Sequence, residues 1–155
     1  MRIRLLAAGN RPPAWIKSGY EEYISRLRPY CRFELIEIPL PSRGKSLSAQ
    51  QARRIEGERM LAALGERDRL IALAIEGEAW STAQLSARLG EWERAGDPLA
   101  LAIGGPDGLD DALLARAQRR WSLSALTLPH LLVRVIVTEQ LYRAHALRDN
   151  HPYHR

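Results

Sequence analysis

The sequence predicts an α/β domain with a mostly parallel sheet and helices on both faces of that sheet. Segments with strand and helix character alternate along the chain, about five of each, as in parallel sheets built from crossover units. Two later runs, 70–75 and 99–103, are apolar at every position, which is typical of strands that are covered on both faces. The chain has 155 residues, enough for a substantial core, so residues 1–155 are expected to form one domain.

The first half of the chain is expected to contain two strands and two helices. Residues 2–8 alternate and then become apolar before a Gly-Asn turn signal, which predicts the first strand. Residues 33–38 alternate and stop at prolines, which predicts the second strand. Between these strands, aromatic and aliphatic residues recur at helical spacing and predict a helix that ends before Pro29. A charged amphipathic helix is expected over 51–64, where a glycine follows as its stop.

The second half is expected to hold, in order, a strand over 70–75, a helix through Leu85, Leu89 and Trp92, a strand over 99–103, a short helix over 113–117 and a long helix over 131–147. Ser81 or Thr82 is placed to cap the first of these helices. The stretch 121–130, W-S-L-S-A-L-T-L-P-H, is too irregular for a plain helix or a solvent-facing strand. It predicts a loop with a buried backbone that leads into the last helix.

Three loops follow late strands, and we expect them to form a binding pocket. They are residues 75–77, 104–108 and 123–128. Ligands of parallel α/β sheets bind at the carboxyl ends of the strands, where these loops would converge. A buried loop backbone needs partners for its N–H and C=O groups, and a ligand is one source of them. Gly104 and Gly105 would let a ligand approach the backbone, although G-G-P-D-G is by itself also a turn motif.

Arginine dominates the basic side chains. The chain has 23 Lys and Arg against 18 Asp and Glu, a net charge of +5, and only Lys17 and Lys45 are lysines. Because the planar fork of arginine suits phosphate, RNA or DNA is a plausible partner, although a coding bias gives the same composition. The basic loop 42–46 contains G-K-S without the first glycine of the Walker pattern, so triphosphate binding is not expected. A loop that touches RNA phosphates and a plain solvated turn both stay open.

The composition also bears on location and on metal binding. Cys31 is the only cysteine, which excludes an internal disulfide and fits a reducing compartment. The start of the chain lacks a signal-peptide pattern, and no stretch approaches the roughly 20 apolar residues of a membrane helix. We therefore expect a cytoplasmic protein with no membrane partner. His151 and His154 are three residues apart with no third ligand, so no metal is expected.

The end of the chain carries two further signals. The helix over 131–147 is apolar over more than one stripe, so it is either a central core helix or packs partly on a second copy of the protein. Glu139 and Arg143 on this helix form a favourable i,i+4 pair. The tail 151–155, H-P-Y-H-R, can stack on a base, contact phosphates and handle protons. A tail that is merely tied to the surface is the alternative.

Several of these runs together carry a family resemblance. They are A-I-G-G-P-D-G at 102–108, W-S-L-S-A-L-T-L-P-H at 121–130, L-V-R-V at 132–135 with E-Q-L-Y-R-A at 139–144, and N-H-P-Y-H at 150–154. With shorter matches at 8–9 and 34–39, the likeness covers nearly the whole chain. The chain resembles the SPOUT-class large-subunit ribosomal RNA methyltransferase H family. Members of this family use S-adenosylmethionine to methylate the N3 nitrogen of a pseudouridine in 23S ribosomal RNA on assembled ribosomes.

The resemblance implies features that spacing alone does not reveal. A C-terminal trefoil knot is expected, a rare exception among protein folds, and it would form the S-adenosylmethionine pocket. A homodimer is expected to complete each active site. The implied cofactor positions are Leu73, Gly104, Leu123, Ser124, Ala125, Leu126, Thr127 and Leu128. Main-chain groups in an apolar pocket can recognise adenine. The chain departs from a family relative at Ala74, where that relative carries an aspartate.

The resemblance also implies catalytic roles for the end of the chain. Arg143 is expected to stabilise the anionic base, while Tyr153 and His154 position the base or accept its proton. Two alternatives remain: a ribosome-binding factor that has lost catalysis, and a SPOUT enzyme that acts on transfer RNA. The intact run 123–128 and the complete tail argue against the first. The short chain, with no appended RNA-binding domain, argues against the second.

Overall fold

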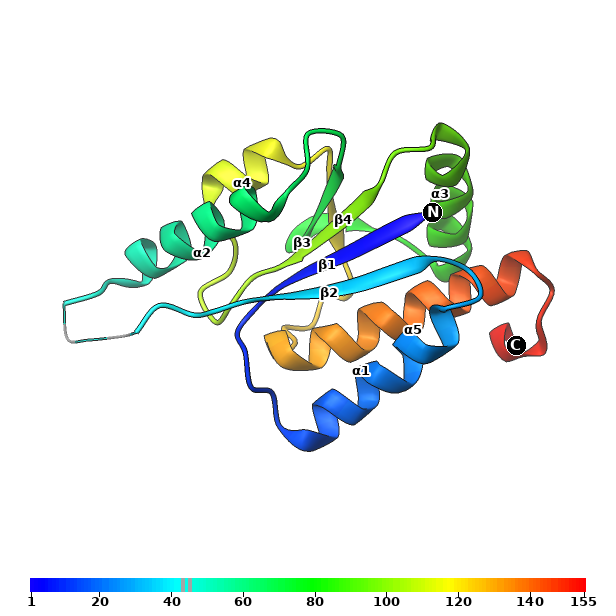
Figure 1. Ribbon diagram of the computed structural model, residues 1–155, viewed down its shortest axis with the longest axis horizontal. Coiled ribbons are helices and arrows are strands. Elements are labelled where there is room, and N and C mark those ends of the chain that lie inside the picture. Colours follow the sequence, from blue (N-terminus) through cyan, green and yellow to red (C-terminus); the bar gives the residue numbers. More distant parts are fainter. Residues whose placement is uncertain (43, 45) are drawn as a thin grey trace.

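The computed structural model describes residues 1–42, 44 and 46–155, so positions 43 and 45 of the predicted basic loop lie outside the described residues. Strands and helices alternate from the first strand to the last helix (Figure 1). In chain order the elements are β1 (Arg2–Ala8), α1 (Ala14–Leu27), β2 (Arg32–Ile38), α2 (Ala49–Ala63), β3 (Arg69–Ala79), α3 (Thr82–Ala95), β4 (Leu99–Ile103), α4 (Asp111–Arg116), β5 (Arg119–Ser122), α5 (His130–Arg148) and the 3-10 turn η1 (Pro152–His154).

All neighbouring strands of the five-stranded sheet are parallel, in the order β2-β1-β4-β3-β5. β1 lies between β2 and β4, with Leu5 opposite Leu35 on one side and opposite Leu101 on the other. Because the strands run in the same direction, the loops that follow their carboxyl ends meet at one edge of the sheet. The predicted parallel α/β architecture is confirmed.

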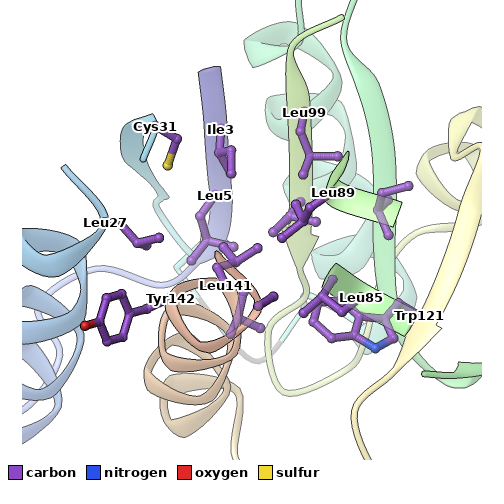
Figure 2. Close-up of a cluster of buried hydrophobic side chains, with 14 of the residues drawn as sticks. Ile3, Leu5, Leu27, Cys31, Leu85, Leu89, Leu99, Trp121, Leu141 and Tyr142 are labelled. Atoms are coloured by element: carbon purple, nitrogen blue, oxygen red, sulfur yellow. The ribbon is translucent and has the colours of Figure 1, made fainter. Parts of the chain in front are cut away.

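Helices cover both faces of the sheet (Figure 1). Successive residues of a strand point to opposite faces, so Leu5 and Leu6 of β1 enter different cores. Leu5 joins the larger core, where Leu27 of α1 and Leu141 of α5 pack together with residues of α3 (Figure 2). Leu6 joins the smaller core on the other face, together with Met60 of α2 and residues of α4. Packing on both faces holds the strands in place, and with them the carboxyl edge of the sheet, where the candidate site lies.

The ends of α3 show how local sequence sets an element. The side chain of Ser81 accepts a hydrogen bond from the Gln84 N–H at 3.2 Å, and the Gln84 side chain accepts one from the Ser81 N–H at 2.8 Å. This capping box satisfies two free donors of the first turn, so Ser81 rather than Thr82 is the cap. Gly96 ends the helix with φ of 76°, in the left-handed region that glycine adopts readily.

The prediction of a loop with a buried backbone over 121–130 is wrong at both ends, since His130 begins α5, and residues 125–127 are exposed rather than buried. Trp121 and Ser122 belong to β5, which pairs in parallel with β3. The first two residues of β5 are exposed arginines and only the last two are buried, so a four-residue strand shows no readable alternation. Pairing with β3, rather than the local sequence, makes this segment a strand.

β3 is longer than the predicted strand 70–75 because it continues to Ala79 through an irregularity. Its pairing with β5 shifts between Leu73 and Glu78, so residues 74–77 form a bulge. A Cβ at Gly77 would lie 2.7 Å from the backbone of Arg120, so only glycine allows β5 to come this close. The sequence E-G-E therefore marks a bulge inside the strand rather than its end.

The trefoil knot stays a prediction of the family resemblance. Among the described residues, no helix is both long enough and apolar enough to cross a membrane. The same residues contain no group of three or more His, Cys, Asp or Glu side chains that are placed to hold a metal ion.

Candidate active site

A cavity of about 500 Å³ opens at the carboxyl edge of the sheet. Its walls come from the bulged part of β3, the loop after β4 and the loop between β5 and α5. Seven of the eight predicted cofactor positions line it, namely Leu73, Gly104, Leu123, Ser124, Leu126, Thr127 and Leu128. Ala125 is not among the lining residues. The three loops thus converge as expected, and the binding of a cofactor between them stays a prediction.

The wall after β4 is a tight turn with no room for a side chain. A Cβ at Gly104 would lie 2.6 Å from the carbonyl carbon of Gly108 and 3.0 Å from the Leu109 nitrogen. The Gly108 N–H donates to the Gly105 carbonyl at 3.0 Å, and Gly108 itself has φ of +84°. A ligand in the cavity therefore meets peptide groups of 104–108 at close range.

The wall between β5 and α5 presents unpaired main-chain groups. The Ser122 hydroxyl donates to the Ser124 carbonyl at 3.1 Å, and the Ser124 hydroxyl accepts from the Leu126 N–H at 3.0 Å. Within the described part of the chain, the N–H of Thr127, which lines the cavity, has no hydrogen-bond partner, and neither has the N–H of Ala125, which lies outside the lining. Two serine side chains thus hold a loop whose remaining donors are free to bind a ligand.

Large apolar side chains at this cavity are exposed to solvent. Leu126 is 71% exposed and Ile75 is 58% exposed, and both line the cavity. Exposed apolar groups that flank unpaired peptide groups suit a ligand with a flat apolar ring and a hydrogen-bonding edge. Adenine has both features.

His130 forms the part of the wall where α5 begins. Its pKa lies below the ordinary histidine value because the ring is partly buried, and the nearby Arg134 guanidinium lowers this pKa further. Sequence reasoning did not assign a role to His130. The sequence shows only that a histidine stands between an apolar loop and a helix. This pattern does not predict that the side chain lines a cavity.

The predicted catalytic side chains form a second cluster, at the far end of α5. The Arg143 Nε donates to Glu139 Oε1 at 2.8 Å, and its guanidinium lies 4.8 Å from the centre of the Tyr153 ring. The Tyr153 hydroxyl donates to the same Glu139 oxygen at 3.0 Å and lies 3.4 Å from the Tyr23 hydroxyl. Sequence reasoning paired Glu139 with Arg143 but missed Tyr23 and Tyr142, which come from outside the tail and pack against Tyr153.

The electrostatic environment of this tail cluster favours a charged Arg143 and a neutral Tyr153. The Glu139 carboxylate raises the pKa of Arg143, so the guanidinium stays charged. Burial raises the pKa of the Tyr153 hydroxyl, and its hydrogen bonds to Tyr23 and Glu139 act in the same direction. The phenol is thus a hydrogen-bond donor near neutral pH rather than a proton acceptor. His154 is part of the turn η1, where its Nδ1 contacts the His151 carbonyl, and its side chain is half-buried.

His130 at the cavity is the first residue of α5, and the tail with η1 follows the other end of this helix (Figure 1). His130 opens the helix at the cavity, and Arg143 follows 13 residues later. At 1.5 Å per residue, these two residues are about 20 Å apart along the helix axis. None of the three predicted catalytic residues lines the cavity. One chain therefore does not bring its own tail to its own cavity.

Comparison with known proteins defines the class. The family model described as "Predicted SPOUT methyltransferase" matches residues 1–154. The chain belongs to this SPOUT methyltransferase family. A solved structure of a methylase family protein from Neisseria gonorrhoeae aligns with a TM-score of 0.60 over 91% of this chain and 81% of that chain. At 14% sequence identity, that likeness shows the fold alone.

More specific similarity comes from curated relatives that bear one name, Ribosomal RNA large subunit methyltransferase H. The relative from Alkalilimnicola ehrlichii is 53% identical, and the alignment covers 100% of this chain and 99% of the relative. The relative from Hahella chejuensis is 50% identical with the same coverage. The relative from Pseudomonas aeruginosa strain LESB58 is 46% identical over the full length of both chains. The resemblance read from the sequence motifs is confirmed.

Proposed function

We propose that this chain uses S-adenosylmethionine to methylate the N3 nitrogen of a pseudouridine in 23S ribosomal RNA on assembled ribosomes in the cytoplasm. The observation that carries the proposal is the convergence of three loops on a cavity of about 500 Å³. The names of the full-length relatives support ribosomal RNA as the substrate. The net charge of +5 suits a polyanionic partner.

The cavity residues fit the methyl donor. Peptide groups of 123–128 and 104–108 would bind the adenosine part, and the exposed faces of Ile75 and Leu126 would cover its ring. S-adenosylmethionine supplies an electrophilic methyl group on a positively charged sulfur. The role of the chain is to hold that methyl group in line with the target nitrogen, since alignment alone lowers the barrier by several kcal/mol. Ala74 offers no polar side chain to the donor.

The tail cluster fits the target base. The permanently charged Arg143 would stabilise negative charge on the base as its N3 proton leaves. Tyr153, a hydrogen-bond donor held by Glu139, would position the base, and His154 would contact it from the same turn. Because none of these residues lines the cavity of its own chain, and Arg143 is about 20 Å along α5 from His130, we propose that they serve the cavity of a partner copy in a homodimer.

Methyl transfer assays test the function directly. In the transfer assay, the protein is incubated with S-adenosylmethionine that carries a labelled methyl group and with assembled ribosomes, free large subunits or transfer RNA. In a separate measurement, calorimetry determines binding of the donor to the protein without RNA. We expect donor binding and labelling of ribosomes at N3 of a pseudouridine. Donor binding without transfer to any RNA would favour the inactive ribosome-binding factor. Labelling of transfer RNA alone would favour the other alternative.

Replacement of the tail side chains tests their roles one at a time. Arg143→Ala, Tyr153→Phe and His154→Ala should each lower turnover far more than donor affinity, since none of them lines the cavity. Tyr153→Phe is the most conservative of the three because it removes only the hydroxyl that donates to Glu139. Unchanged turnover in all three variants would remove the proposed roles.

Mixing of two defective chains tests the shared site. A Gly104→Ala chain has a weakened cavity and a Tyr153→Phe chain has a defective tail, so at donor concentrations near the wild-type dissociation constant each homodimer should have little activity. A mixed dimer would contain one intact and one doubly defective site. Random mixing should then restore about one quarter of the wild-type activity, because half of the dimers are mixed. If each site is built within one chain, mixing restores nothing.

A further inference from the structure

His130 is the only histidine that lines the cavity. It is the first residue of α5 and directly follows the loop between β5 and α5 that lines the cavity. The other three histidines lie elsewhere: His145 is buried near the far end of the same helix, and His151 and His154 belong to the tail. Among the described residues of one chain, His130 is therefore the one imidazole at the cavity, and the proposed dimer would add His154 of a partner copy.

The imidazole of His130 lies close to the backbone of Gly9. A Cβ at Gly9 would lie 3.4 Å from the His130 Nε2 and 3.6 Å from an Arg134 nitrogen, so the missing side chain leaves room for both groups. Arg134 is fully buried and donates to the Ala8 carbonyl at 3.0 Å and to Glu37 Oε2 at 2.9 Å. A third hydrogen bond joins Arg134 to the Gly9 carbonyl. This network ties the start of α5 to the ends of β1 and β2.

The charges around His130 disfavour a protonated ring. Burial is the main reason that its pKa is lowered, and Arg134, one turn further along α5, is the second. The amino end of α5 acts in the same direction, because the helix dipole disfavours a cation there. Glu37 of β2 is engaged with Arg134, and Tyr20 of α1 also contacts Arg134 through its hydroxyl.

The remaining cavity wall carries charge of both signs. Its charged groups are Arg53, Glu76, Asp107 and Asp111. None of these four contributes to the pKa shift of His130. At neutral pH the ring is uncharged and has a free nitrogen lone pair, which is what a general base requires.

We propose that His130 is a further catalytic residue, the base that removes the N3 proton of the target pseudouridine; this inference rests on the proposed function. The N3–H bond breaks and its proton passes to a ring nitrogen of His130. The electron pair left on N3 forms the new bond to the methyl carbon. The carbon–sulfur bond breaks, and its electron pair stays on sulfur, which changes from a sulfonium to a thioether. The proton then leaves His130 to solvent.

Tyr153 and the carboxylates of the cavity wall are less suitable bases, and His154 of a partner copy is the competing candidate. Tyr153 keeps its proton near neutral pH because of the pKa shift described above. The carboxylates of the cavity wall are weaker bases than a neutral imidazole, and proton transfer is most effective when the pKa of the base lies near the working pH. With His130 as the base, Arg143 and Tyr153 are left to bind the anionic form of the nucleobase.

The test compares His130→Gln and His130→Ala with the wild type on ribosomes at a series of pH values. At pH 7 we expect single-turnover methyl transfer to fall by about 100-fold or more, the usual range for loss of a general base. Donor affinity by calorimetry should stay within a few-fold of wild type. The deficit should shrink at alkaline pH, where N3 ionises without a base. Added imidazole should partly restore His130→Ala, which has space for it, but not His130→Gln.

A merely structural role would give a different pattern. A deficit that stays constant with pH and does not respond to imidazole would overturn the proposal, as would wild-type transfer in both variants. The wild-type enzyme should also show an acidic limb with a midpoint below the ordinary histidine pKa of about 6.5, and both variants should lack that limb. If the wild type transfers no methyl group to ribosomes at any pH, the proposed function fails rather than the role of His130.

Discussion

Gly104→Ala is the sharpest single test of the cavity. The new Cβ would lie 2.6 Å from the carbonyl carbon and 2.7 Å from the carbonyl oxygen of Gly108. Both neighbours are backbone atoms in a turn that is closed by a hydrogen bond to Gly105, so no side chain can rotate away. The turn 104–108 must move, and this turn forms one wall of the cavity.

The size of the effect follows from this geometry. An ordinary carbon–carbon contact is about 3.5 Å, so the turn must shift by about 0.9 Å. Overpacking of this kind costs about 1–3 kcal/mol. If the unliganded protein relieves the strain by moving the turn, donor binding must restore the original position at that cost. Since 1.4 kcal/mol corresponds to a factor of ten, the dissociation constant for S-adenosylmethionine should rise by about 5- to 150-fold.

Calorimetric titration measures this change, and Gly96→Ala is the matched control. Gly96 also has a positive φ, of +76°, but a Cβ there meets nothing within 4 Å, and the residue ends α3 rather than lining the cavity. The control should lose about 1 kcal/mol of stability from backbone strain and keep the wild-type affinity. A folded Gly104→Ala protein that binds the donor within twofold of wild type would refute the reasoning.

Three further predictions concern stability and are measured by urea denaturation. Asp68→Ala should cost about 3–5 kcal/mol because it leaves the buried Arg4 without its ion-pair partner, and a cost below 1 kcal/mol would contradict this. Gly77→Ala should cost about 1–3 kcal/mol, since its Cβ would lie 2.7 Å from the backbone of Arg120; an unchanged midpoint would show that the bulge yields freely. Burial lowers the pKa of His145, and Arg148 lowers it further, so the unfolded chain takes up a proton first as the pH falls. Wild type should therefore lose more stability than His145→Gln between pH 7 and 5, whereas parallel profiles would exclude this linkage.

The larger elements were predictable because their patterns are local. The continuous apolar run of β4 and the alternation in β2 both gave strands with nearly the expected bounds. The short strand β5 was missed, since two of its four residues are exposed arginines and its strand character depends on pairing with β3. The bulge over 74–77 was taken as the end of a strand for the same reason. Contacts that are distant in sequence decided both cases.

In the candidate site, too, the features that local sequence determines were predictable, and the features that depend on distant contacts were not. The cavity positions were predictable because loops at the carboxyl ends of parallel strands converge in space and the family motif marks them. His130 was missed because nothing in its spacing reveals that its ring lies beside Gly9 at the cavity. The distance of about 20 Å between His130 and Arg143 follows from their separation along α5. The proposed use of Arg143 in the cavity of a second copy does not follow from the sequence of one chain.

The length of α5 has a consequence for how activity depends on concentration. If α5 keeps the donor cavity and the tail of each chain apart, an isolated subunit would be inactive even when its cavity is saturated with the methyl donor. Specific activity should then decline on dilution in step with dissociation of the pair. Newly made chains would then stay inactive until they met a second copy, and geometry alone would prevent methylation by unassembled subunits.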